Sequence, residues 1–231
     1  MLRKRIVCGL ACVAALLCAC APRYPDDRLV SIVQKLEPSI VMLAMRLPPE
    51  HASDAYDVSF ASGSVVASGA WGSDILTVRH AVRGAWHMFV TVGNTHKVPG
   101  RVIALDPVND IALVRIARPN LPVVALGSSR ELATQTGRDV ALMGYPIPDE
   151  IDGGLRTSLV TGTLSAVRKN ALEMSLEVVP GESGGPVFLA DTGEIVGVVE
   201  ARIGEEPSIG FALPIDDAKR FLHRYDAQHG F

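Results

Sequence analysis

Cysteine is missing from almost the whole chain. All four cysteines, Cys8, Cys12, Cys18 and Cys20, lie within the first 20 of the 231 residues. The remainder can therefore form neither a disulfide framework nor a cysteine-based metal site. A folded part of this kind has to be held together by its hydrophobic core, and we expect neither a metal nor a cofactor.

An excess of basic charge is also missing. The 22 lysines and arginines are outnumbered by 25 aspartates and glutamates, which gives a net charge of −3. Removal of Arg3, Lys4 and Arg5 with a cleaved leader would take the net charge to −6. Nucleic acids bind to basic faces, so this balance argues against a nucleic-acid partner.

The first 20 residues have the features of an export signal. Arg3, Lys4 and Arg5 precede an apolar run over residues 6–18, which is too short to span a membrane comfortably. The run ends in Leu17-Cys18-Ala19-Cys20, which resembles a bacterial lipoprotein box. We therefore predict a lipoprotein signal peptide over residues 1–19, with Cys20 lipidated after cleavage. The alternative is simple cleavage after Ala21, which would leave Pro22 directly after the cut.

This interpretation places the protein in the bacterial cell envelope. Acyl chains on Cys20 would anchor it to a membrane without spanning it, facing the periplasm or the exterior. Cleavage before Cys20 would leave 212 of the 231 residues, a length that suits one domain of two-barrel size.

The order of secondary structure is readable from Cys20 onward. Residues 20–38 are predicted to be a tether and an N-terminal helix that stops at Pro38. Short segments rich in valine and isoleucine follow, separated by Gly, Pro, Asn and Asp, which is typical of an all-β barrel pair. They extend to an amphipathic closing helix over residues 215–226. A linker at residues 117–122 divides the strands into an N-terminal barrel, about 39–117, and a C-terminal barrel, about 121–214, with Val123–Leu126 as a strand.

Three motifs carry the candidate chemistry. His80 follows the apolar segment Ile75–Val78, Asp110 heads the apolar segment Ile111–Val114, and Ser183 lies in Gly181-Glu182-Ser183-Gly184-Gly185-Pro186. The order His, Asp, Ser is that of chymotrypsin-type proteases. We therefore predict a serine endopeptidase with Ser183 as nucleophile, His80 as general base and Asp110 as the group that orients the imidazole. The backbone N–H groups of Gly181 and Ser183 are the predicted oxyanion hole.

Two alternatives compete with parts of this assignment. Gly181 to Gly185 also fits the nucleophile elbow of an α/β-hydrolase, but that fold needs a helix directly after the serine and the acid and histidine downstream. Pro186 and the strand-like residues after it do not suit such a helix. Asp106 competes with Asp110, but Pro107 places Asp106 in a turn, where it would cap or be solvated. Asp110 is expected to enter the core at the head of a strand, and His80 to lie in a packed corner.

The chain resembles the HtrA/Deg family of trypsin-like serine proteases across roughly residues 39–222. The resemblance rests on the three motifs above and on five further segments, Ala61–Val66, Val140–Pro146, Val160–Ala166, Ile195–Val199 and Ile209–Pro214. It implies two six-stranded antiparallel β-barrels of the chymotrypsin type with the site in the cleft between them. It also implies polypeptide substrates, including unfolded envelope proteins, and a role in envelope protein quality control.

The chain departs from the family pattern at several points, and two of them bear on activation. The family usually continues into PDZ domains, whereas this sequence stops after the closing helix, so activation through such a domain is not expected. Glu182 replaces the asparagine that usually precedes the nucleophile, which leaves open whether the serine loop is active at rest. The rival function is a catalytically silent protease-like scaffold that binds envelope proteins. Cleavage preference and oligomeric state are not predicted.

Overall fold

The computed structural model describes residues 27–46, 58–146, 156–202 and 209–229. The predicted signal peptide, Cys20 and the first part of the tether lie outside these residues. Within the described part, no helix is both long and apolar enough to cross a membrane.

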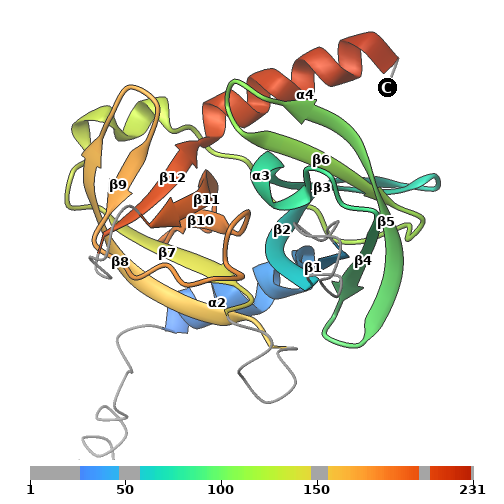
Figure 1. Cartoon of the computed structure of the whole chain (residues 1–231). Coiled ribbons are helices and arrows are strands. Elements are labelled where there is room, and N and C mark those ends of the chain that lie inside the picture. The colour runs from blue at the N-terminus through green and yellow to red at the C-terminus, as the bar shows by residue number, and fades with distance from the viewer. Residues whose placement is uncertain (1–26, 47–57, 147–155, 203–208, 230–231) are drawn as a thin grey trace, which may run out of the picture.

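The predicted pair of barrels is confirmed. Each barrel is closed and built from six antiparallel strands. The two stand side by side, with helix α4 above them and helix α2 below (Figure 1). Around the N-terminal barrel the strand order is β1-β2-β3-β6-β5-β4, and around the C-terminal barrel it is β10-β11-β12-β9-β8-β7.

The N-terminal barrel follows one helical segment and contains another. It is preceded by α2 (Asp27–Leu36) and the 3₁₀ turn η2 (Glu37–Ser39), and α3 (Arg79–Val82) interrupts its strands. The strands are β1 (Ile40–Arg46), β2 (Val58–Gly69), β3 (Gly72–Val78), β4 (His87–Val92), β5 (His96–Asp106) and β6 (Ile111–Ile116).

The C-terminal barrel comes after the 3₁₀ turn η3 (Arg130–Thr134) and ends in α4 (Ile215–His229). Its strands are β7 (Asp139–Gly144), β8 (Ser158–Val167), β9 (Leu172–Met174), β10 (Pro186–Leu189), β11 (Ile195–Arg202) and β12 (Gly210–Pro214). The predicted strand Val123–Leu126 is wrong: only Leu126 forms an isolated bridge, to Ile195. The remainder of that segment hydrogen-bonds at single points, such as Val124 N–H to Val65 C=O at 3.0 Å.

Hydrophobic packing joins the barrels as well as filling them. One cluster of buried side chains fills the N-terminal barrel and continues into the C-terminal barrel at Tyr145, Phe188 and Val198. It also takes in Phe221 and Tyr225 of α4. A second cluster lies within the C-terminal barrel. Because the apolar core crosses the boundary, loops on the facing sides of the barrels are held close to one another.

Candidate active site

His80 and Asp110 meet at one end of the N-terminal barrel. His80 lies in the single turn of α3 that follows β3, and Asp110 directly precedes β6, the strand paired with β3. Nδ1 of His80 lies 2.5 Å from Oδ2 of Asp110. The backbone N–H of His80 donates to Oδ1 at 2.9 Å, and the N–H of Arg79 donates to the carbonyl of Asp110 at 2.9 Å. Three hydrogen bonds therefore fix the imidazole relative to the carboxylate.

The surroundings of this pair differ from the sequence expectation. The side chain of His80 is 47% exposed and that of Asp110 is 22% exposed, so His80 does not lie in a packed corner and Asp110 is only half-buried. Asp110 has a φ of 51°, in the left-handed region that aspartate tolerates better than most residues. The turn before β6 thus directs the carboxylate toward α3 instead of into the barrel.

Asp106 holds the turn that presents Asp110. It is the more deeply buried of the two aspartates, with 6% of its surface exposed. Oδ1 accepts hydrogen bonds from the N–H groups of Val108 and Asn109 at 3.0 and 3.2 Å, and Oδ2 accepts from Nδ2 of Asn109 at 2.9 Å. The expectation that Asp106 caps the turn agrees with these bonds, but the idea that it is solvated is wrong.

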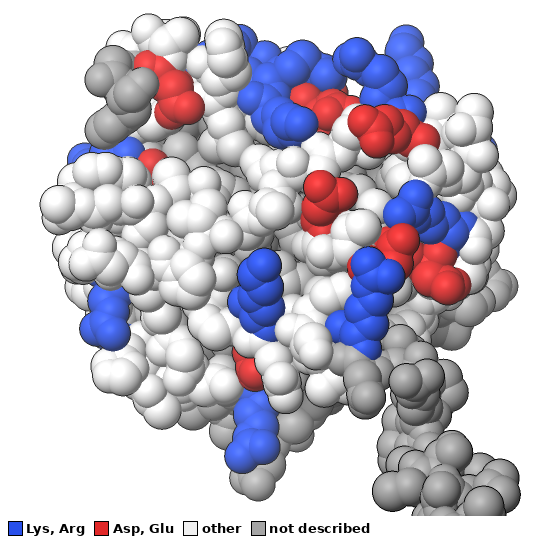
Figure 2. Space-filling view, turned by 180° about the vertical axis from the view of Figure 1, so that it is seen from behind, with Lys and Arg blue, Asp and Glu red and all other residues white. Residues whose placement is uncertain are grey.

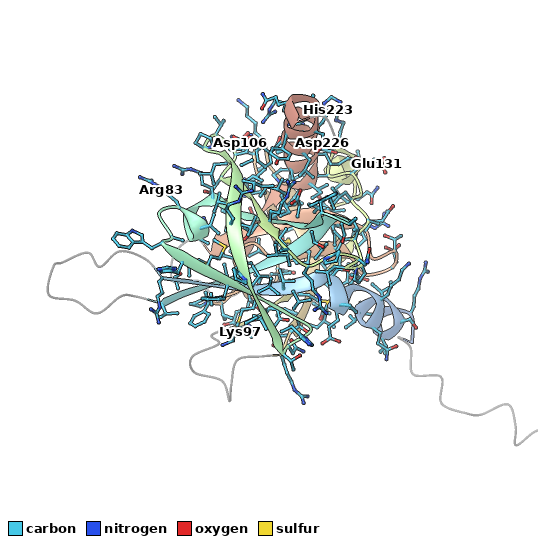
Figure 3. The ribbon with its side chains drawn as sticks, turned by 90° about the vertical axis from the view of Figure 1, so that its right-hand side faces the viewer. Arg83, Lys97, Asp106, Glu131, His223 and Asp226 are labelled. Atoms are coloured by element: carbon cyan, nitrogen blue, oxygen red, sulfur yellow. The ribbon has the colours of Figure 1, made fainter. Side chains whose placement is uncertain are left out.

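Asp106 is also paired with α4. Nη2 of Arg224 donates to Oδ2 at 2.8 Å. Burial raises the pKa of Asp106, but the hydrogen bonds from Asn109 and Val108 and the charge of Arg224 outweigh it, and the net pKa lies below its ordinary value. Figure 3 shows Asp106 at the end of β5 near α4, which carries His223 and Asp226, while Lys97 lies at the other end of the strand.

Ser183 is provided by the C-terminal barrel, on the loop between β9 and β10. Its carbonyl accepts the N–H of Ser62 at 2.8 Å, and the N–H of Gly184 donates to Val199 of β11 at 2.8 Å. Gly184 has a φ of 85°, and a Cβ there would collide with the Thr77 hydroxyl and the Ser62 carbonyl. Only glycine therefore lets the loop approach the N-terminal barrel this closely. Within the described part of the chain, the Ser183 hydroxyl makes no hydrogen bond to His80 or to any other group.

The two predicted oxyanion donors differ from the neighbouring N–H groups of the loop in their hydrogen bonding. The N–H groups of Glu182, Gly184 and Gly185 donate to the carbonyls of Val179, Val199 and Glu182. The N–H groups of Gly181 and Ser183 have no acceptor among the residues that the structure describes. Gly181 has a φ of 95°, which again favours glycine. The loop therefore leaves two backbone donors for an incoming group.

Within the described residues, the Glu182 carboxylate makes no hydrogen bond to those donors. It is 1% exposed, and its Oε2 accepts the N–H of Val179 at 2.9 Å. Burial raises the pKa of Glu182 from 4.5 to about 6, against the lowering effect of the Val179 hydrogen bond and with a smaller raising effect from the charge of Glu177. The carboxylate of Glu182, which stands where the family usually has asparagine, is thus buried and hydrogen-bonded within its own loop.

Ser62 on β2 contacts the serine loop, and the sequence analysis gave it no role in the site. It is fully buried, and its Oγ donates to the carbonyl of Gly181 at 2.8 Å and accepts the N–H of Tyr145 at 2.9 Å. Its own carbonyl accepts the hydroxyl of Thr77 at 2.8 Å. The contact with Gly181 is 119 residues distant in sequence, so no local pattern announces it.

Glu200 brings a further carboxylate near His80 and Asp110. It lies at a bulge of β11, where the register with β12 shifts between Val199 and Ala201. Burial raises the pKa of Glu200, the charge of Asp110 raises it further, and His80 acts in the opposite direction. Among the described residues, no group of three or more His, Cys, Asp or Glu side chains is arranged to hold a metal ion.

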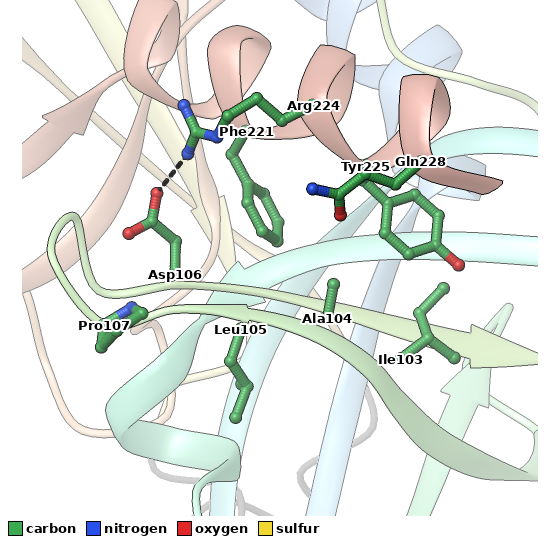
Figure 4. A pocket seen from close by; sticks show the side chains of 9 residues that line it. All are labelled: Ile103, Ala104, Leu105, Asp106, Pro107, Phe221, Arg224, Tyr225 and Gln228. Carbon is green, nitrogen blue, oxygen red and sulfur yellow. Dashed lines mark hydrogen bonds and ion pairs between the residues drawn. The ribbon is translucent and has the colours of Figure 1, made fainter.

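A groove of about 400 Å³ lies between α4 and the end of β5. Phe221 and Tyr225 extend from the helix toward the strand, and the Arg224–Asp106 pair closes one end (Figure 4). His80, Asp110 and Ser183 do not line it. Figure 2 shows the face opposite to that in Figure 1, where basic and acidic side chains are interspersed and form no extended surface of one sign.

Comparison with known proteins decides the family. Residues 61–198, more than half of the chain, match the model of the trypsin-like peptidase domain. The chain belongs to this family. The match contains Ser62, His80, Asp110, Glu182 and Ser183, whereas Glu200 and Arg224 lie outside it.

Named relatives and solved structures agree with this assignment. A protein of Synechocystis named as the serine protease HhoB is 30% identical over 185 residues, which are 75% of this chain and 41% of the relative. The Do-like serine protease HtrB of Bacillus subtilis is 29% identical over 157 residues, 63% of this chain and 34% of the relative. The chain thus spans well under half the length of these relatives.

The fold is that of HtrA-type proteases. The structure of the HtrA-type protease AlgW with a decapeptide has a TM-score of 0.73 and 22% identity, and covers 88% of this chain and 68% of that one. The predicted resemblance to HtrA/Deg proteases and the predicted chymotrypsin-type fold are confirmed.

Proposed function

We propose that the protein is a serine endopeptidase that cleaves polypeptides through Ser183, His80 and Asp110. The observation that carries this proposal is the His80–Asp110 pair, with Nδ1 2.5 Å from the carboxylate. The pair lies at the end of β3, and Thr77 of that strand is closely approached by the loop that holds Ser183 and two unused backbone donors. Membership of the trypsin-like peptidase family supports the proposal.

Each group has one task in the proposed mechanism. Because Nδ1–H of His80 donates to Asp110, Nε2 carries the lone pair and can take the proton of the Ser183 hydroxyl. Oγ then bonds to the scissile carbonyl carbon, and the N–H groups of Gly181 and Ser183 stabilise the oxyanion. Nε2 returns the proton to the leaving amine, and a water activated by His80 hydrolyses the acyl-enzyme.

The hydrogen bond between Ser183 and His80 is proposed to form when a substrate binds. No hydrogen bond joins the two side chains in the described part of the chain, and in substrate-free enzymes such contacts are often long. The half-exposed imidazole has room to turn toward Oγ while its bonds to Asp110 hold its other edge.

Active-site labelling with a fluorophosphonate probe tests the activity. The wild-type protein should be labelled and should cleave an unfolded protein such as casein. Ser183→Ala should abolish both, while Ser165→Ala, which changes an exposed serine on β8, should leave both unchanged. A folded wild-type protein that takes no label would contradict the endopeptidase and favour the catalytically silent scaffold.

The setting of this activity is proposed on the sequence features and on the relatives. Several relatives are named as periplasmic serine endoproteases of the DegP-like type, as in Halomonas elongata. We propose an exported, bacterial envelope protein that is anchored through a lipid on Cys20 and acts on unfolded envelope proteins in protein quality control. Metabolic labelling with a fatty acid tests the anchor: Cys20→Ser should remove both the label and membrane attachment, and persistence of either would contradict the lipid site.

A further inference from the structure

Ser62 bonds to the serine loop from the opposite barrel. It lies in β2 of the N-terminal barrel, opposite Met42 of β1, and no part of it is exposed. Its backbone N–H donates to the carbonyl of Ser183, and its hydroxyl donates to the carbonyl of Gly181, both at 2.8 Å. Two of the three carbonyls from Gly181 to Ser183 are therefore held by one residue of another strand.

The remaining bonds of Ser62 leave its hydroxyl little freedom. Oγ has one proton, which goes to Gly181, and it accepts the N–H of Tyr145 at 2.9 Å. The carbonyl of Ser62 is in turn bonded to the buried hydroxyl of Thr77 at 2.8 Å. Both the side chain and the backbone of Ser62 are thus fixed, and the direction of the proton on Oγ is determined by its surroundings.

These bonds act on the orientation of the loop peptides. A peptide unit is planar, with its C=O and N–H directed oppositely, so a bond to the carbonyl of Gly181 fixes the whole Gly181–Glu182 unit. The N–H at the other end of that unit donates to Val179. Gly181 has the backbone freedom of glycine, and without the bond from Ser62 this unit could rotate and turn a carbonyl toward the reacting centre.

We propose that Ser62 is a positioning residue that keeps the oxyanion hole open. By holding the peptide units Gly181–Glu182 and Ser183–Gly184 through their carbonyls, it fixes the backbone on both sides of the Ser183 N–H and directly after the Gly181 N–H, so that both N–H groups stay available to the developing oxyanion. The role rests on the proposed endopeptidase function. It makes the loop of the C-terminal barrel competent only when it is docked on the N-terminal barrel.

Ser62→Ala is the direct test. The oxyanion contact strengthens in the transition state, so kcat should fall by about 10- to 100-fold with little change in KM. The rate of fluorophosphonate labelling should fall by a similar factor. In a Ser183→Ala background, the affinity for an uncleaved peptide should not change when Ser62→Ala is added. Ser62→Thr, which keeps the hydroxyl, should recover part of the rate.

Ser64→Ala is the matched control, because Ser64 is buried on the same strand and its hydroxyl makes no hydrogen bond within the described part of the chain. It should retain the wild-type kcat. Should Ser62→Ala not fold, Thr77→Val removes the bond to the Ser62 carbonyl with little change of shape, and should lower kcat in the same direction by a smaller factor.

The outcomes separate this role from the proposed function. A wild-type protein that is not labelled overturns the endopeptidase itself. A labelled wild type whose folded Ser62→Ala variant, or Thr77→Val in its place, keeps the full kcat overturns the role of Ser62 alone. A lower midpoint of unfolding with unchanged kcat would mean that Ser62 only stabilises the fold, which also contradicts the proposal.

Discussion

In the N-terminal barrel, His80 and Asp110 are joined to each other by bonds that begin and end within the same barrel. In the C-terminal barrel, the loop of Ser183 has two carbonyls bonded to Ser62 of the other barrel. The proposed acid–base pair is therefore a local product of β3, α3 and β6, whereas the loop of the proposed nucleophile depends on contacts between barrels. Substitutions in the first group should change the chemistry, and substitutions in the second should change the geometry in which the chemistry occurs.

The largest effect is expected from the acid–base pair. Asp110→Asn keeps the size of the side chain but no longer requires the Nδ1–H tautomer of His80, so kcat/KM should fall by roughly 10³- to 10⁴-fold. Peptide cleavage at fixed pH measures it. Asp226→Asn on the exposed side of α4 is the control, and should be silent. A loss below tenfold for Asp110→Asn would mean that His80 does not need this carboxylate.

A smaller effect is expected from the turn that carries Asp110. Asp106→Ala removes three hydrogen bonds within the turn and the pair with Arg224, and should lower the free energy of unfolding at pH 7 by about 2 kcal/mol. Because the turn presents Asp110, kcat should also fall by about tenfold. Urea unfolding and peptide cleavage measure the two losses.

Two further results would sharpen the role of Asp106. Arg224→Ala removes only one of its contacts and should cost less in both measurements. Since the folded pKa of Asp106 is lowered, its contribution should be present above pH 4 and fade as the pH falls through its titration. Equal stability losses for Asp106→Ala and Arg224→Ala would contradict the assignment of the turn bonds to Asp106.

The serine loop should show the opposite dependence on pH. The pKa of Glu182 rises from 4.5 in its ordinary state to about 6 in the folded protein, so the unfolded chain releases the proton first. The contribution of Glu182 to the free energy of unfolding should therefore decrease by about 1–2 kcal/mol as the pH rises from 4.5 to 7. Urea unfolding across this range should show a smaller decrease for Glu182→Gln than for the wild type, with exposed Glu131→Gln as the control.

The smallest effect is expected on β4 of the N-terminal barrel, two strands away from Ser62. The Thr91 hydroxyl on β4 is buried and has no hydrogen-bond partner among the described residues. Thr91→Val replaces it with a methyl group of the same shape, and should leave stability unchanged or raise it by up to about 1 kcal/mol. Kinetic constants should stay at wild-type values. A clear loss of stability would mean that the hydroxyl is bonded in solution.

Local patterns led to the residues of the proposed triad. His80, Asp110 and Ser183 each lie in a short segment whose adjacent residues indicate the local structure. The structure brings His80 and Asp110 together. The strand at Val123–Leu126 was wrong because its apolar residues contact other strands at isolated points without a ladder. A valine-rich segment does not reveal whether a partner strand is available.

The long-range contacts could not be predicted. The bond from Ser62 to Gly181 spans 119 residues and the pair between Asp106 and Arg224 spans 118. Neither follows from hydrophobic period or from turn chemistry. The direction of the Glu182 side chain was equally hidden, because only the folded loop shows that Val179 offers it an N–H. These contacts form only when the two barrels dock on each other, and the sequence alone does not predict how they dock.

The pair between Arg224 and Asp106 has a consequence for the order in which the chain is made. His80 and Asp110 are synthesised early, but the arginine that steadies their turn is 118 residues later than Asp106, and Ser183 is also late. A partly emerged chain therefore contains the acid and the base without the nucleophile or the steadied turn. During synthesis, the chain would be unable to cut its neighbours or itself until Ser183 had been made, and the turn that presents Asp110 would gain its last hydrogen bond only with the final helix.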